Sequence, residues 1–304
     1  MRVILDTDIG TDVDDCLALA LLLHSPQLQL EGVTCVYGDV DLRARMALKL
    51  LHLWGLENIP VMAGARKPLL GLRDIYWEGH EGEGLLTAED AGLPITPEFA
   101  PDYLVRMVME NPGQIHLIAI GPLTNVALAL LKEPHMAQNL AHLTIMGGVL
   151  RGAHDLSLPY VEHNIKCDPE AAHIVFSSGA PITLIPLDTT VQVRVNRDGL
   201  SRIQAVDTPF TAAVAGQLER YPRFQVQGWT SLHDPLAVGA VIRPDLVELT
   251  PVHLDVELGG RFTPGATLMR SPNSDFPANV QVALKVHISE FESFFVNQLA
   301  NKRS

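Results

Sequence analysis

The feature that most constrains this chain is an acidic turn that directly follows a short apolar run near the N-terminus. The run Val3-Ile4-Leu5 has the length and composition of a buried strand in a parallel sheet. Five carboxylates then fall within ten residues: Asp6, Asp8, Asp12, Asp14 and Asp15. So many acids cannot all stay ionised at close range without a cation, and an all-oxygen cluster suits Ca²⁺ or Mg²⁺. A solvated acidic turn with a helix cap is the alternative interpretation, although a cap needs only one Asp.

The composition argues against several kinds of partner. Of the 304 residues, 47% are hydrophobic and 19% are charged, which is ordinary for one large α/β unit. The formal net charge of −13 argues against a nucleic-acid backbone and against an anionic membrane surface. The three cysteines give no disulfide framework, and the first strand begins at Arg2 without a leader pattern. We therefore expect a cytoplasmic protein that binds neither nucleic acid nor membrane.

Strand and helix patterns alternate along the chain, which is typical of a parallel sheet. Strands are predicted at residues 30–37, 59–62, 115–120, 143–146 and 182–187, and helices at 16–24, 43–56, 97–110, 209–218, 233–242 and 290–300. Residues 252–286 read as strands with turns at 259–260 and 271–273. These patterns predict an α/β fold: one domain over residues 1–304, with an open, mostly parallel, Rossmann-like sheet and helices on both faces. The glycine-rich stretch 64–92 is long for a connection and favours a functional loop or lid.

Polar residues follow several of the predicted strands and would share one rim of a doubly wound sheet. They are Asp6, Asp8, Asp39, Asn125, Met146, Asn164 and Asp188. Further along, His233-Asp234-Pro235 opens a helix. The alternative role of Asp234 is a helix N-cap, since Pro235 would occupy the first helical position, and a cap can also be a ligand.

Six segments together resemble the inosine–uridine-preferring nucleoside hydrolase family. The resemblance begins with the Asp-x-Asp-x-Gly turn and the Asp14-Asp15 pair, and it spans nearly the whole chain in the family's order. The other segments are Gly121-Pro122-Leu123-Thr124-Asn125, Met146-Gly147-Gly148, Glu162-His163-Asn164-Ile165, Asp168-Pro169-Glu170-Ala171-Ala172 and His233-Asp234-Pro235. This resemblance implies hydrolysis of the N-glycosidic bond of ribonucleosides, purine or pyrimidine, to free base and ribose. It also implies a role in nucleoside salvage and a homodimer or homotetramer.

The resemblance also implies roles for individual residues. Asp8, Asp15, Asp234 and the backbone carbonyl of Ile120 correspond to ligands of a Ca²⁺ ion, and Asp8 to the general base that deprotonates a metal-bound water. The residues expected to bind the nucleoside are Asp14, Asp39, Met146, Glu162 and Asn164. The chemistry is coherent in itself, because carboxylates stabilise the positive charge that develops on the sugar and a bound cation lowers the pKa of its water.

The resemblance places histidines at His80 and His233, and we expect help for the leaving base from one of them. A neutral nucleobase leaves badly as an anion, so a proton donor would accelerate the reaction. The nearby carboxylates are expected to favour the imidazolium form of either ring. The alternative is that His80 is a simple loop residue and His233 a simple helix-start residue.

The chain departs from the family pattern in several places. Thr11-Asp12 look like an insertion before the Asp14-Asp15 pair. Asp39 stands where the family more often has Asn, and His163 where it has Phe. The loop 151–160 lacks the family's Asn, for which Asp155 could substitute.

Two other classes of function fit parts of the sequence. Asp6-Thr7-Asp8 resembles the nucleophile motif of haloacid-dehalogenase-like phosphohydrolases, although that motif does not usually continue to Gly10. A non-catalytic nucleoside- or ribose-binding protein of the same fold is the second alternative, because fold alone does not guarantee activity.

Overall fold

A nine-stranded sheet forms the centre of the protein. The computed structural model describes residues 1–151, 155 and 157–301. The strands of the sheet are β1 (Arg2–Thr7), β2 (Gln29–Cys35), β3 (Val61–Ala63), β4 (Ile115–Ala119), β5 (His142–Met146), β6 (Ile182–Ile185), β9 (Val247–Val256), β10 (Thr267–Arg270) and β11 (Val280–Val286). Their order is β10-β9-β11-β6-β5-β4-β1-β2-β3. A separate antiparallel pair is formed by β7 (Arg194–Asn196) and β8 (Trp229–Ser231).

The direction of the strands confirms the predicted mostly parallel α/β fold. β1 is parallel to both of its neighbours, β2 and β4, and the parallel pairing continues through β5 and β6 to β11. β9 runs antiparallel to β11 and β10. The chain therefore goes to one side of β1 with β2 and β3, and to the other side with β4. This reversal makes the carboxyl end of β1 a topological switch point, where ligands bind in open α/β sheets.

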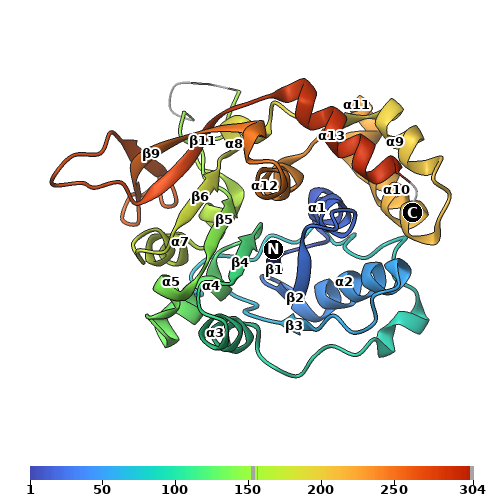
Figure 1. The fold of residues 1–304 in the computed structure, drawn as a ribbon, viewed down its shortest axis with the longest axis horizontal. Coiled ribbons are helices and arrows are strands. Elements are labelled where there is room, and N and C mark those ends of the chain that lie inside the picture. The colour runs from blue at the N-terminus through green and yellow to red at the C-terminus, as the bar shows by residue number, and fades with distance from the viewer. Residues whose placement is uncertain (152–154, 156, 302–304) are drawn as a thin grey trace.

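Helices cover both faces of the sheet (Figure 1). They are α1 (Asp14–Leu23), α2 (Val40–Trp54), α3 (Ala100–Glu110), α4 (Thr124–Lys132), α5 (Met136–Asn139), α6 (His163–Cys167), α7 (Pro169–Phe176), α8 (Leu187–Thr190), α9 (Arg197–Gln204), α10 (Pro209–Arg220), α11 (Pro222–Gln227), α12 (His233–Ile242) and α13 (Ile288–Ala300), with the 3₁₀ turns η1 (Ala88–Gly92) and η2 (Pro244–Leu246). Alternation along β1 separates the two cores. Val3 and Leu5 belong to the core shared with α1, α2, α12 and α13, whereas Ile4 belongs to the core shared with α3, α4 and α7.

The long elements begin and end close to their predicted positions. The helix predicted at 233–242 is α12, with the same bounds, and the turns predicted at 259–260 and 271–273 separate β9, β10 and β11. The glycine-rich stretch 64–92 holds one short 3₁₀ turn, η1, and is otherwise irregular. In the described part of the chain, no helix has the length and apolar character needed to cross a membrane.

Two histidines lie side by side at the amino ends of β4 and β5, opposite the end of the sheet where the switch point lies. His116 on β4 is paired in register with His142 on β5, and their ring centroids are 5.1 Å apart. Each Nε2 lies 2.8 Å from a threonine hydroxyl, that of Thr144 for His116 and that of Thr183 for His142. Burial lowers the pKa of His116 to about 3, with a smaller contribution from His142, and burial also lowers the pKa of His142. Both rings are therefore neutral in the folded protein near pH 7.

We predict that His116 makes the fold sensitive to acid. Its folded pKa of about 3 lies below the ordinary value of 6.5, so between these pH values the unfolded chain binds a proton that the folded chain does not. Stability is therefore complete above pH 6.5 and falls by about 1.4 kcal/mol per pH unit through this window. In urea unfolding at pH 7 and pH 5, His116→Gln should lose less stability on acidification than the wild type. The exposed His173 provides the control, because His173→Gln should keep the wild-type pH dependence. An unchanged pH dependence in His116→Gln would contradict the prediction.

Candidate active site

A large cavity opens at the switch point beyond β1. Its volume is about 620 Å³, which lies within the range of small-molecule sites. Segments from along the chain line it: Asp8, Thr11, Asp12, Asp14, Asp15, Tyr76, Glu78, His80, Ile120, Met146, Ser157, Pro159, Glu162, His163, Asn164, Leu187, Val191, Tyr221, Pro222, Arg223, Ser231, His233 and Asp234. Most of the residues that the sequence singled out are thus brought to one place.

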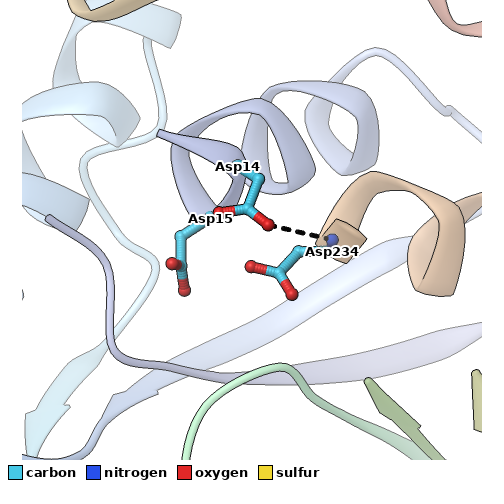
Figure 2. Close-up of side chains that lie close together, drawn as sticks. All are labelled: Asp14, Asp15 and Asp234. Carbon is cyan, nitrogen blue, oxygen red and sulfur yellow. Dashed lines mark hydrogen bonds between the residues drawn. The ribbon is translucent and has the colours of Figure 1, made fainter. Parts of the chain in front are cut away.

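Three carboxylates meet in the interior of this cavity (Figure 2). Asp14 and Asp15 begin α1, Asp234 lies in the first turn of α12, and each offers an oxygen within 4.8 Å of the others. The backbone N–H of Asp234 donates to Oδ2 of Asp14 at 3.4 Å. All three side chains are buried, and burial followed by repulsion from neighbouring carboxylates raises their pKa values well above the usual range. Such a set is costly without a cation and offers the oxygen ligands that a hard divalent ion prefers.

Asp8 and Ile120 line the same cavity. Burial raises the pKa of Asp8, and the charges of Arg43 and His163 oppose that increase. The carbonyl oxygen of Ile120 accepts a hydrogen bond of 2.8 Å from Nδ2 of Asn164. A carbonyl has a second lone pair, so this bond leaves Ile120 able to bind a cation as well.

A buried arginine holds the acidic turn from behind. Arg43 on α2 is fully buried, and its guanidinium donates to the carbonyl oxygens of Asp8, Ile9 (2.9 Å) and Tyr37 (2.6 Å). It also donates to the hydroxyl of Thr11 at 3.2 Å. Its partners are neutral oxygens, so its positive charge remains available to the nearby carboxylates.

Glu162 and Asn164 form another wall of the cavity. Glu162 caps α6, and its carboxylate accepts from the backbone N–H groups of Gly148 (2.9 Å), Asn164 (2.7 Å) and Ile165 (3.1 Å). Asn164 also donates to the carbonyl of Met146 at 3.3 Å. These bonds fix both side chains in place, and both still line the cavity with polar atoms. Burial raises the pKa of Glu162.

Thr11 and Asp12, the pair expected to be an insertion, connect the acidic turn to two distant segments. The hydroxyl of Thr11 donates to Glu81 at 3.1 Å, and the carbonyl of Thr11 lies 3.1 Å from Nε2 of His80, so the glycine-rich stretch is attached here. Oδ2 of Asp12 accepts from the Tyr221 hydroxyl at 2.8 Å, which attaches the junction of α10 and α11. Thr11 and Asp12 therefore connect the segments that form this wall of the cavity.

The structure corrects the expectation that His233 is an imidazolium. Burial lowers the pKa of His233 to about 4, and the opposing effect of Asp12 is smaller. Nδ1 of the ring lies 2.7 Å from the Thr190 hydroxyl. The carboxylates thus do not decide the charge of this ring, because burial destabilises the charged form by more than the attraction of Asp12 stabilises it. His80 lines the cavity, as expected for a residue near the substrate.

Some candidate residues lie elsewhere. Asp39 is not among the described residues that line the cavity; it caps α2 through the N–H of Leu42 (3.0 Å) and lies 3.7 Å from Arg66. Its place at a strand end suggested a substrate contact, but its side chain turns to the helix that it begins. Asn125 donates to the buried Asp6 at 2.8 Å. The predicted loop 151–160 falls partly outside the described residues.

Asp188 and Asp155 accept hydrogen bonds from other residues of the protein. Asp188 accepts from the N–H groups of Leu150 (2.7 Å) and Arg151 (2.9 Å). Asp155 accepts from the hydroxyl of Ser157 at 2.6 Å and is exposed.

Comparison with known proteins decides between the classes of function. The model of the inosine–uridine preferring nucleoside hydrolases matches residues 3–293. The chain belongs to this family. As a family member it is a nucleoside N-ribohydrolase, as the sequence motifs predicted.

The related proteins align with nearly the full length of this chain. It is 36% identical to the non-specific ribonucleoside hydrolase RihC of Salmonella newport, over 99% of this chain and 98% of that protein. Among solved structures, a plant nucleoside hydrolase, PpNRh1, is 30% identical with a TM-score of 0.85, over 98% of both chains. A purine-preferring ribonucleoside hydrolase from Gardnerella vaginalis is 29% identical with a TM-score of 0.84, over 99% of this chain and 98% of that chain.

The sequence did not single out several residues of this hydrolase site. Arg43, Tyr221 and Arg223 lie within helical patterns or between them, and nothing in their local sequence separates them from surface residues. Glu81 stands in the glycine-rich stretch that was predicted to be a functional loop. The sequence alone does not distinguish it from its acidic neighbours Glu78 and Glu83.

We predict that Arg43→Met destabilises the hydrolase by about 3 kcal/mol, since the replacement leaves several buried carbonyl oxygens without a donor. It should also lower the affinity of the carboxylate cluster for a divalent cation, with Ca²⁺ as the probe, because the turn that carries Asp8 loses its anchor. Urea unfolding and calorimetric titration with Ca²⁺ measure the two effects. Arg45→Met, on the same helix but only half-buried, should change neither, and equal effects of the two variants would contradict the role of Arg43.

Proposed function

We propose that this protein hydrolyses the N-glycosidic bond of ribonucleosides, purine, pyrimidine or both, to free base and ribose, with the help of a bound Ca²⁺ ion. One observation carries the proposal: three buried carboxylates within 4.8 Å of one another open onto the same cavity as Glu162 and Asn164. The similarity to RihC, named as a non-specific ribonucleoside hydrolase, supports a broad range of bases.

The residues present fit a hard divalent cation. Asp15 and Asp234 would hold it, together with Asp8 and the carbonyl oxygen of Ile120, which line the same cavity. Their donor atoms are all oxygens, as Ca²⁺ requires. When bound, the ion would lower the pKa of a coordinated water and so supply a nucleophile near neutral pH.

The chain's own residues would orient the sugar and receive the proton. Asp14, Glu162 and Asn164 bind the ribose hydroxyls, which makes the attack effectively unimolecular. Asp8 accepts the proton of the attacking water as general base. The carboxylates around the sugar stabilise the positive charge that develops on the ring as the bond to the base breaks.

The alternative classes have less support. Asp6 would be the nucleophile of a haloacid-dehalogenase-like phosphohydrolase, but its Oδ1 binds the Thr34 hydroxyl (2.5 Å) and Asn125, and Asp6 is not among the described residues that line the cavity. A non-catalytic nucleoside-binding protein would bind nucleosides without releasing ribose, so the assays below separate it from the hydrolase.

The setting of the activity is part of the same proposal. Cys16, Cys35 and Cys167 are free and buried, which suits a reducing cytoplasm. A role in nucleoside salvage is an implication of the family resemblance. A homodimer or homotetramer remains a prediction from the family resemblance.

We predict that Ca²⁺ removal abolishes the release of ribose from inosine and uridine and that added Ca²⁺ restores it. Asp15→Asn and Asp234→Asn should each lower turnover by at least about 10³-fold, since each removes a charged ligand and leaves the cluster with an imperfect cation site. A reducing-sugar assay measures turnover. Asp102, which pairs with Lys132 away from the cavity lining, provides the control, because Asp102→Asn should retain activity. Full turnover after complete removal of divalent ions would refute the metal's role.

We predict that the enzyme rejects 2′-deoxynucleosides. Loss of one hydroxyl leaves buried acceptors such as Glu162 unpaired, which should lower kcat/KM for 2′-deoxyinosine by at least about 100-fold relative to inosine. Glu162→Gln should bring the kcat/KM values for inosine and 2′-deoxyinosine closer together while it lowers the turnover of inosine. Comparable kcat/KM values for the two substrates in the wild type would show that the ribose hydroxyls are not bound in this way.

A further inference from the structure

One arginine is exposed on the wall of this acidic cavity. Among the described residues that line the cavity, Arg223 is the only lysine or arginine, and its guanidinium has no hydrogen-bond, ion-pair or ring partner in the described part of the chain. Two other arginines differ in this respect, since Arg43 is fixed by backbone carbonyls and Arg151 pairs with Asp188 at 3.1 Å. An arginine keeps its charge at any ordinary pH. A free guanidinium beside a cavity is therefore available to a ligand that brings an acceptor.

The backbone that carries Arg223 is anchored on both sides. Tyr221, which ends α10 and caps α11, is held by Asp12 at 2.8 Å, and Pro222 follows at the first position of α11. Phe224 is buried in the core. Arg223 stands between these anchors, so its side chain starts from a fixed point on the cavity wall.

The arrangement of the cavity places the base of a nucleoside near this wall. The proposed ribose binders Asp14 and Glu162 are buried, whereas Tyr221 is half-buried and Arg223 is exposed at the rim. A nucleoside whose sugar reaches the buried carboxylates must extend its base toward the rim. His80 is already engaged there through Nε2, which donates to the carbonyl of Thr11 at 3.1 Å.

We infer that Arg223 binds the departing base and favours bases with a carbonyl acceptor, hypoxanthine above all, over adenine. This inference rests on the proposed function of the site. When water oxygen bonds to C1′, the C1′–N bond breaks and its electron pair goes to the base, while the water proton goes to Asp8. Hypoxanthine spreads the resulting negative charge to O6, and O6 and N7 form an edge that accepts two parallel N–H bonds from a guanidinium. Adenine presents an N–H₂ donor in place of O6, which the guanidinium cannot bind.

The test compares variants on three ribosides. In Arg223→Gln, kcat/KM for inosine should fall about 10- to 100-fold, while adenosine and p-nitrophenyl riboside should change by less than about threefold. The nitrophenolate leaves without help, so it reports on the sugar and the metal alone. Arg223→Lys should recover part of the inosine activity, because it restores the charge but not the paired donors. The control is Arg220→Gln, which removes a charge three residues earlier at the end of α10, outside the described cavity lining, and should leave the inosine-to-adenosine ratio unchanged.

Other results would overturn the inference. Equal losses on all three ribosides would mean that Arg223 acts on the sugar, on the metal or on the carboxylates, and no loss on inosine would mean that it does not contact the base. A wild-type inosine-to-adenosine ratio that falls as pH rises through 7 would point to a histidine donor instead, because the charge of Arg223 does not change there. Absence of ribose release from every nucleoside by the wild type would instead refute the proposed function itself.

Discussion

Repulsion among the buried carboxylates at the carboxyl end of β1 is the constraint on which the surrounding structure depends. Burial raises the pKa values of Asp8, Asp14, Asp15 and Asp234, so in the absence of a compensating charge the folded chain favours their neutral forms. Arg43 partly compensates by holding the turn with a buried positive charge. The same repulsion gives a divalent cation its affinity, because the ion relieves a cost that the fold has already incurred.

Thr11 and Asp12 connect the carboxyl end of β1 to the outer wall of the cavity. Thr11 reaches the glycine-rich stretch through Glu81, and Asp12 reaches the junction of α10 and α11 through Tyr221. Glu81 in turn accepts from the N–H groups of Glu78 (2.9 Å) and Gly79 (2.7 Å), which gives an irregular segment a fixed shape. The acidic turn and the cavity wall that carries Tyr221 are therefore parts of one hydrogen-bonded unit.

The sequence was informative where local patterns determine structure. The apolar run before the acidic turn, the helix 233–242 and the alternation of strands and helices gave the mostly parallel sheet, and strand ends located most of the cavity. It was uninformative where contacts between segments distant in sequence determine the position of a side chain. Asp39 has the position of a site residue but caps α2, and α6 and α11 are too short for a helical period to be seen. The bond between Asp12 and Tyr221 joins residues 209 positions apart, which no local pattern encodes.

The cluster of Asp14, Asp15 and Asp234 is assembled from segments that lie far apart in the chain. Asp14 and Asp234 are 220 residues apart in sequence, and they meet because α1 and α12 pack side by side on one face of the sheet (Figure 1). A chain still being synthesised, or one that has lost its C-terminal third, would lack Asp234 and so present an incomplete cluster. A divalent cation in this cluster would therefore bind the completed fold more tightly than its precursors, and its binding would stabilise the last step of folding.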